Sequence, residues 1–151
     1  MLDDQRKSTI PVVCDQAIIQ EVTAICEQAR QFYQQAIPEI TNNNVRRYFA
    51  ALAQLHQRPY QLDTAEWPKA TTTSNSATLW QWYHHHSKAI TTSQAHWRTE
   101  LPQQLFLQLT LFKHLSRTLV HPDNTRELAN LTASLQMLAD ELIPLLLNED
   151  L

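Results

Sequence analysis

The amino-acid sequence predicts an all-α domain in which one helical-hairpin pattern occurs twice. Glycine, which supplies the left-handed turns of β-hairpins and phosphate loops, is absent from the 151 residues. An amphipathic helix, a break rich in Asn, Pro and Asp, and a second helix occur near 15–62 and again near 101–147. A chain of this length is typical of a single domain, 1–151, with a substantial core.

The first hairpin begins after a polar segment. Residues 1–11 are predicted to form a tail that ends at Pro11, and Asp15 is a candidate N-cap or first-turn residue. A helix is then predicted near 15–37, with apolar residues at helical spacing: Ile18, Val22, Ile25, Ala29, Phe32 and Ala36. Pro38 and the run 41–44 are predicted to end this helix and to cap the next.

The second helix is predicted near 43–60. One side of it carries Val45, Tyr48, Phe49, Leu52, Leu55 and His56, and Pro59 is expected to bend or end it. The next segment, 63–77, is polar, β-branched and interrupted by Pro68, so it is predicted to be a loop. A less regular helix follows at 77–96, and 63–100 as a whole is predicted to form a crossover between the two hairpins.

The second hairpin is predicted to consist of helices near 103–120 and 124–143. Pro102 suits the first turn of a helix, and residues 121–124 form a turn with a cap. The alternating leucines of 105–111 would also suit a strand, but the helical spacing extends far beyond them and leucine favours helices. The predicted core residues of this hairpin are Leu109, Phe112, Leu115, Leu131, Leu135 and Leu138.

Charge and hydropathy argue against two classes of partner. The net charge of -3 is small and the basic residues are scattered, which does not favour a nucleic-acid-binding surface. The charged first residues lack the apolar stretch of a secretory signal, and no apolar run approaches the roughly 20 residues of a membrane span. We therefore expect a cytoplasmic protein that binds neither nucleic acid nor membranes.

Three segments resemble proteins of the ferritin-like superfamily. QARQFYQQAIPEITNNNVRRYFAALAQLHQ resembles the first hairpin of rubrerythrin-like proteins, and LSRTLVHPDNTRELANLTASLQMLADELIPLL resembles the second. LWQWYHHHSKA resembles the Trp-containing linker helix of a small uncharacterised bacterial branch. The resemblance covers about 15–147 and implies an antiparallel four-helix bundle with one long crossover.

Active members of that superfamily bind two irons through a carboxylate on every helix. Placed on this pattern, Glu27 matches the glutamate of the first helix. The glutamate and histidine positions of the second helix fall at or near His56 and at Pro59, and those of the last helix at about Leu135 and Leu138. The resemblance therefore implies a degenerate metal site.

The sequence itself shows the loss of carboxylates. No Asp or Glu lies between Glu39 and Asp63, or between Glu100 and Asp123. Two of the four main predicted helices therefore cannot supply the oxygen ligands that iron needs. This excludes a di-iron carboxylate oxidase, and we predict no catalytic residue and no cofactor.

Histidines provide the remaining candidate sites. Glu27, His56 and His114 are candidates for a metal or small-ligand site, although a histidine on an apolar helix face is more often a hydrogen-bonded core residue. His84, His85 and His86 point about 100° apart on a helix and cannot converge on one ion. A solvated surface patch is the predicted state of this run, and its capacity to bind metal stays open.

Two hypotheses for the function of the protein remain. The first is a non-enzymatic bundle that associates with other proteins, most simply as a homodimer, because five apolar residues of 142–147 surround the last helix. The alternative is a bundle that binds a small ligand or a single metal through Glu27 and His56.

Overall fold

The computed structural model describes the backbone of residues 2–57, 74–90 and 94–148, and the side chains from residue 15 onward within these ranges, except 74 and 94–96. In these ranges the chain forms helices and no strand. The elements are α1 (Leu2–Ala36), the 3₁₀ turn η1 (Ile37–Glu39), α2 (Asn43–Gln57), α3 (Ser74–Lys88), α4 (Gln94–Thr118) and α5 (Pro122–Leu146). The predicted all-α fold class is confirmed.

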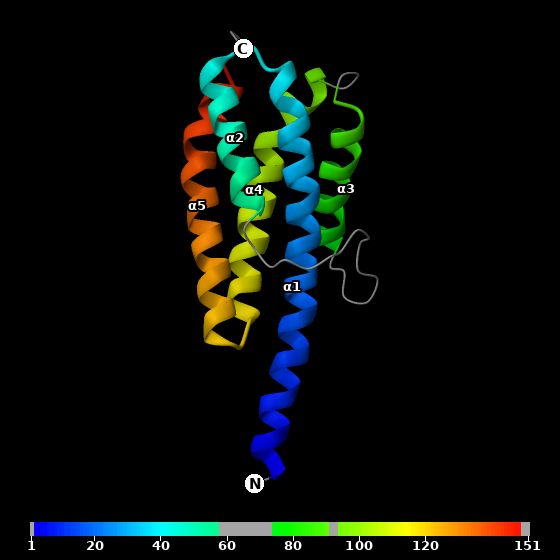
Figure 1. The fold of residues 1–151 in the computed structure, drawn as a ribbon, viewed down its shortest axis with the longest axis vertical. Coiled ribbons are helices and arrows are strands. Elements are labelled where there is room, and N and C mark those ends of the chain that lie inside the picture. The colour runs from blue at the N-terminus through cyan, green and yellow to red at the C-terminus, as the bar shows by residue number, and fades with distance from the viewer. Residues whose placement is uncertain (1, 58–73, 91–93, 149–151) are drawn as a thin grey trace.

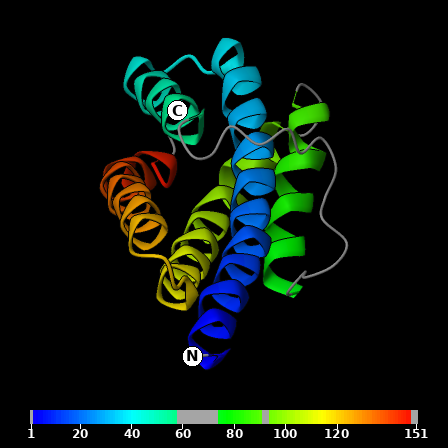
Figure 2. The ribbon, with the colours of Figure 1, turned by 60° about the horizontal axis from the view of Figure 1, so that its bottom comes forward.

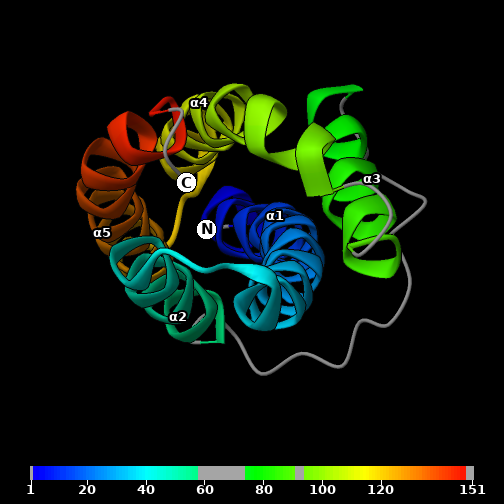
Figure 3. The ribbon, with the colours of Figure 1, turned by 90° about the horizontal axis from the view of Figure 1, so that it is seen from above.

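The helices surround a common core (Figures 1 and 2). The helix pairs α1/α2 and α4/α5 each form an antiparallel hairpin, and α2 packs against α5 to join them. On the opposite side, α3 packs between α1 and α4, as the view from above shows (Figure 3). The crossover helix is therefore part of the wall of the bundle, and the side chains of Trp82 and Tyr83 pack against Phe32 of α1.

The turn between α1 and α2 follows from local sequence. The helix α1 ends at Ala36, and Pro38 lies in the 3₁₀ turn η1. Asn42 precedes α2, and its side-chain Oδ1 accepts hydrogen bonds from the backbone N–H groups of Asn44 at 2.9 Å and Val45 at 3.1 Å. These bonds satisfy donors that the first turn of a helix leaves without partners. The predicted cap within 41–44 is confirmed.

Asp15 does not cap the start of the first helix, as the sequence predicts, but binds the turn between α4 and α5. It lies inside α1 and is 2% exposed. Its carboxylate accepts hydrogen bonds from the backbone N–H groups of Val120 and His121, both at 2.9 Å, and from the Asn124 side chain at 3.1 Å. Burial alone would raise the pKa of this carboxyl, but these hydrogen bonds hold it below its usual value. Asp15 therefore fastens the α4–α5 turn to α1.

The predicted core of the second hairpin is largely confirmed. Leu109, Phe112, Leu115, Leu131 and Leu135 are buried. Leu138 is half-buried and packs against the same core. The alternating leucines of 105–111 lie in α4, so the strand alternative is wrong.

Several predicted boundaries are wrong. The helix α1 begins at Leu2 rather than near residue 15, so residues 2–11 are helical rather than a tail; they contain helix formers such as Leu, Gln, Arg and Lys. The helix α4 begins at Gln94, so the crossover does not extend to residue 100, and Pro102 lies within a helix. The loop predicted at 63–77 falls mostly outside the described residues, as do Pro59 and the polar run 91–93.

The C-terminal leucines also differ from expectation. The helix α5 continues through Pro144 to Leu146, because proline removes a single N–H donor and the apolar face on either side still packs. Leu142 and Leu146 are buried, and Ile143 and Leu145 pack partly against the core. Leu147 is 68% exposed. Most of the apolar surface that suggested a dimer is therefore covered within the chain. No helix in the described ranges is long and apolar enough to cross a membrane.

Candidate functional site

Four buried polar side chains form a hydrogen-bonded series through the centre of the bundle, which we call the central polar chain: Tyr33, Tyr83, Gln108 and His56. The two tyrosine hydroxyl oxygens lie 2.9 Å apart, and the Tyr83 hydroxyl lies 2.6 Å from the Gln108 Oε1. The Gln108 Nε2 lies 2.9 Å from the His56 Nε2, and the His56 Nδ1 lies 2.7 Å from the Leu52 carbonyl oxygen. The chain thus links α1, α3, α4 and α2.

The hydrogen bonds of the chain have one consistent order. A carbonyl oxygen only accepts, so the His56 Nδ1 carries a proton and donates it to Leu52. In a neutral imidazole the Nε2 then accepts from the Gln108 amide, whose oxygen accepts from the Tyr83 hydroxyl. The Tyr83 hydroxyl has used its proton, so it accepts from Tyr33. Every link of the chain therefore has one donor and one acceptor.

Burial keeps the central polar chain uncharged. Tyr33, Tyr83 and Gln108 are fully buried and His56 is 2% exposed. Desolvation lowers the pKa of His56 to about 4, against a smaller opposing effect of its bond to Leu52. Desolvation raises the pKa of both tyrosines well above the usual range. At neutral pH the chain can therefore hold a hydrogen-bond pattern but offers no charged group for catalysis.

Aromatic rings surround the chain. Phe49 meets the Tyr33 ring edge-on with ring centroids 5.1 Å apart, and the His56 ring stacks on Tyr33 at 5.6 Å. Phe32 contacts both tyrosines, at 5.1 and 5.7 Å. This packing fixes the ring orientations on which the hydrogen bonds depend.

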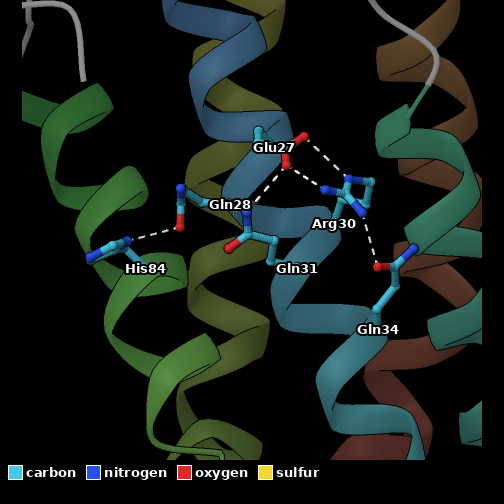
Figure 4. A network of polar contacts seen from close by, with 6 residues as sticks. All are labelled: Glu27, Gln28, Arg30, Gln31, Gln34 and His84. Atoms are coloured by element: carbon cyan, nitrogen blue, oxygen red, sulfur yellow. Dashed lines mark hydrogen bonds and ion pairs between the residues drawn. The ribbon is translucent and has the colours of Figure 1, made fainter. Parts of the chain in front are cut away.

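The three predicted candidates Glu27, His56 and His114 do not converge. Only His56 lies in the core, and both its ring nitrogens are engaged. Glu27 lies on a half-exposed face of α1, where its carboxylate pairs with Arg30 and accepts a bond from Gln31 at 3.2 Å (Figure 4). The Arg30 hydrogen bond holds the pKa of Glu27 below its usual value. His114 is exposed on α4. Among the described residues, no group of three His, Cys, Asp or Glu side chains could hold a metal ion.

The prediction of a solvated patch at residues 84–86 is wrong for His86, which is buried, and holds only in part for His84, which is half-buried. His84 stacks on Trp80 with centroids 4.6 Å apart and bonds to Gln28 of α1 at 2.9 Å (Figure 4). His86 is buried, and its Nε2 lies 3.3 Å from the Glu100 carboxylate of α4. His85 is exposed. Because neighbouring residues of a helix point about 100° apart, two of the three face the helices that flank α3.

Sequence reasoning missed Gln108, Tyr33 and Tyr83 as members of one polar group. A signal for Gln108 exists, because it occupies a position of the apolar stripe of α4, three residues after Leu105 and four before Phe112. A glutamine on such a stripe needs hydrogen-bond partners inside the protein. The tyrosines carry no such signal, because tyrosine suits an apolar helix face whether or not its hydroxyl has a partner.

A small cavity lies at the end of the bundle where α1 ends and α2 begins; we call it the end cavity. It has a volume of about 220 Å³ and is lined by Glu39, Ile40, Thr41, Asn42, Val45, Trp97, Arg98 and Leu146. Trp97 is 1% exposed, and its indole Nε1 is buried with no acceptor among the described residues. A buried donor without an acceptor costs about 1–3 kcal/mol of stability.

A second concave surface lies between α2 and α5 on the outside of the bundle; we call it the α2/α5 groove. Its volume is about 290 Å³ and its lining residues are Ala51, Gln54, Leu55, Ser134, Met137 and Leu138. Met137 is 68% exposed, the same fraction as Leu147. This is a surface with apolar character on the outer face of the bundle.

Comparison of the chain with protein-family models, with characterised proteins and with solved structures found no match. The geometry of the described residues is therefore the basis for assigning a function.

Proposed function

We propose that this chain is a non-enzymatic helical bundle that works by protein association, and that its partner at the α2/α5 groove is a second copy of itself. The observation that carries the proposal is a contrast between the inside and the outside of the bundle. The donors and acceptors of the central polar chain are hydrogen-bonded to one another, whereas the α2/α5 groove exposes Met137 and other apolar atoms to solvent.

The proposal includes descent from the ferritin-like fold. Two antiparallel hairpins that meet through α2 and α5 support this relation. The central polar chain consists of neutral Tyr, Gln and His side chains and contains no carboxylate, which supports the loss of a di-iron site. A metal at His56 would have to displace either Gln108 or the Leu52 carbonyl from the imidazole.

Charge placement around the groove favours a second copy as the occupant. Arg47 lies four residues before Ala51 on α2, and Glu141 lies four residues after Met137 on α5. Residues four apart share a helix face, so both charged residues extend the groove-lining faces of their helices. Both are exposed, and the side chain of Tyr48, the residue after Arg47, is hydrogen-bonded to Glu141, which puts the two charged positions at the same level of the bundle. Opposite charges thus flank one end of the groove.

A twofold axis parallel to the groove makes this surface self-complementary. Such an axis places α2 of one copy over α5 of the other, so that Arg47 meets Glu141 of the partner subunit, and the reverse contact repeats it. The same operation places Met137 over the partner subunit's Ala51, since the helices are antiparallel and both residues lie four positions from the charged pair. Apolar burial would supply the affinity and the charge pairs the register.

The test is solution mass by sedimentation velocity across a hundredfold dilution. We expect a concentration-dependent dimer, lost in Met137→Lys and in Arg47→Glu, and restored in Arg47→Glu/Glu141→Arg. Phe106→Lys is the matched control, because Phe106 is a 59% exposed apolar residue of α4 outside the groove. A monomer at every concentration would refute the proposal, as would a dimer that Met137→Lys leaves intact while circular dichroism shows native helix content.

A further inference from the structure

We propose that the outer groove between α4 and α5 binds an acidic amphipathic helix of a different protein. This surface, which we call the α4/α5 groove, has a volume of about 290 Å³. The residues that line it include Lys113, Ser116 and Arg117 of α4 and Ala129, Ala133 and Gln136 of α5. The inference rests on this groove alone and does not depend on the self-association proposed above.

Two basic side chains lie in the middle of the α4/α5 groove. Lys113 and Arg117 are exposed and one helical turn apart. The Lys113 Nζ donates to the neutral amide oxygen of Gln136 at 3.2 Å, which places the ammonium group between α4 and α5. Within the described residues, neither basic side chain forms an ion pair with a carboxylate. Their remaining N–H donors are therefore available to carboxylates of a partner.

The shape of the α4/α5 groove suits a helix. Ala129 and Ala133 are exposed on the α5 side, and their small side chains leave room for another backbone to approach. Phe106, which is 59% exposed, lies two turns before Lys113 on the same face of α4. The surface thus combines an apolar contact with two basic ones at helical spacing. It matches a helix that carries an apolar residue two turns from a group of carboxylates, laid along the groove.

The acidic side chains of this chain indicate that a second copy is not the occupant. In the described part of the chain, Asp123 and Glu127 are the one pair of exposed carboxylates a single helical turn apart, and Asp123 is already paired with Arg126 at 3.7 Å. A second copy therefore offers no unpaired acidic helix face. A continuous polyanion such as DNA would also meet Asp140, which accepts a hydrogen bond from Gln136 at 2.8 Å on the α5 side.

Fluorescence anisotropy with a labelled helical peptide tests the inference on the full chain. The probe is alanine-based, and one of its faces carries three glutamates between two leucines. We expect saturable binding with a Kd below about 100 μM, and at least about tenfold weaker binding when lysines replace the glutamates, a difference of about 1.4 kcal/mol. Lys113→Glu/Arg117→Glu should reverse this preference, so that the lysine peptide binds more tightly than the glutamate peptide. Phe106→Ala should weaken binding of the glutamate peptide at least about threefold.

Two control variants keep the result specific to this surface. Arg46→Glu makes the same kind of charge change at an exposed arginine of α2 and should leave binding unchanged. Met137→Lys should also leave it unchanged, so failure of the self-association proposal stays distinguishable from failure of this one. Circular dichroism checks that each variant keeps its helix content. No binding up to about 1 mM glutamate peptide would overturn the inference. Equal weakening by Arg46→Glu would overturn the placement of the site, and tighter binding of a thymidine oligonucleotide would overturn the acidic helix as its occupant.

Discussion

Replacement of Gln108 by leucine should break the central polar chain at its middle link. The change keeps the approximate size of the side chain but removes both its amide hydrogen bonds. The Tyr83 hydroxyl loses its acceptor, and the His56 Nε2 loses its donor. Both groups are buried, and each buried group left without a partner costs about 1–3 kcal/mol. Gln108→Leu should therefore lower the free energy of unfolding by about 2–6 kcal/mol, measured by urea denaturation with circular dichroism.

A double-mutant cycle distinguishes a linked chain from independent contacts. Tyr83→Phe alone leaves the Tyr33 hydroxyl and the Gln108 Oε1 without partners, again two buried groups. Tyr83→Phe/Gln108→Leu leaves only the Tyr33 hydroxyl and the His56 Nε2, so the double variant should be no less stable than either single variant. Additive losses would refute the linked hydrogen-bond order of the central polar chain. Gln104→Leu, one turn earlier on α4, is the control: it removes a buried Oε1 that has no partner among the described residues, so its effect should be neutral or stabilising.

Three further predictions concern other parts of the fold. The pKa of His56 is about 4 in the folded state, whereas the ordinary pKa of histidine is 6.5, so the unfolded state binds more protons between these pH values. The free energy of unfolding should therefore be greatest above pH 6.5 and fall by about 3 kcal/mol toward pH 4. Urea titrations of His56→Gln should lack this dependence on pH. Asp15→Ala should cost about 2–4 kcal/mol, since it leaves two backbone N–H groups of the α4–α5 turn without their acceptor; a loss below about 0.5 kcal/mol in urea unfolding would contradict this role. Leu135→Ala removes a fully buried side chain and should cost about 2–5 kcal/mol by the same measurement, and near-neutral stability would mean that α5 presents a different face to the core.

Features that depend on neighbours in the sequence could be predicted from it. The cap at Asn42 follows from a run of asparagines beside a proline, and the buried face of α4 follows from leucine spacing. Interactions between distant segments could not be predicted in this way. Asp15 resembles any helix-capping residue, and nothing near it indicates that its partners lie more than 100 residues later, with separations of 105 and 106.

The candidate sites show the same limit. The sequence correctly indicates that α2 contains no carboxylate, and it singles out His56. It could not indicate that Gln108 is the partner of His56, because that pairing depends on which faces of α2 and α4 meet. Proline removes a backbone hydrogen bond inside a helix, so Pro102 and Pro144 predict helix boundaries. Both nevertheless lie within helices, which the packing of the surrounding residues maintains. The end cavity combines residues from η1, α2, α4 and α5, and no local pattern marks it.

The bonds of Asp15 have a consequence for how the chain reaches its folded state. Its carboxylate closes a loop of more than 100 residues, so the α1/α2 hairpin leaves the ribosome long before the groups that pair with Asp15 have been synthesised. Until then the Asp15 carboxylate stays hydrated, and the N-terminal half of α1 has no contact with the α4–α5 turn. We expect that contact to form late, after both hairpins, because the entropy of closing such a loop has to be offset by contacts already made. A nascent chain stalled before Val120 would therefore expose the site at which the second hairpin attaches.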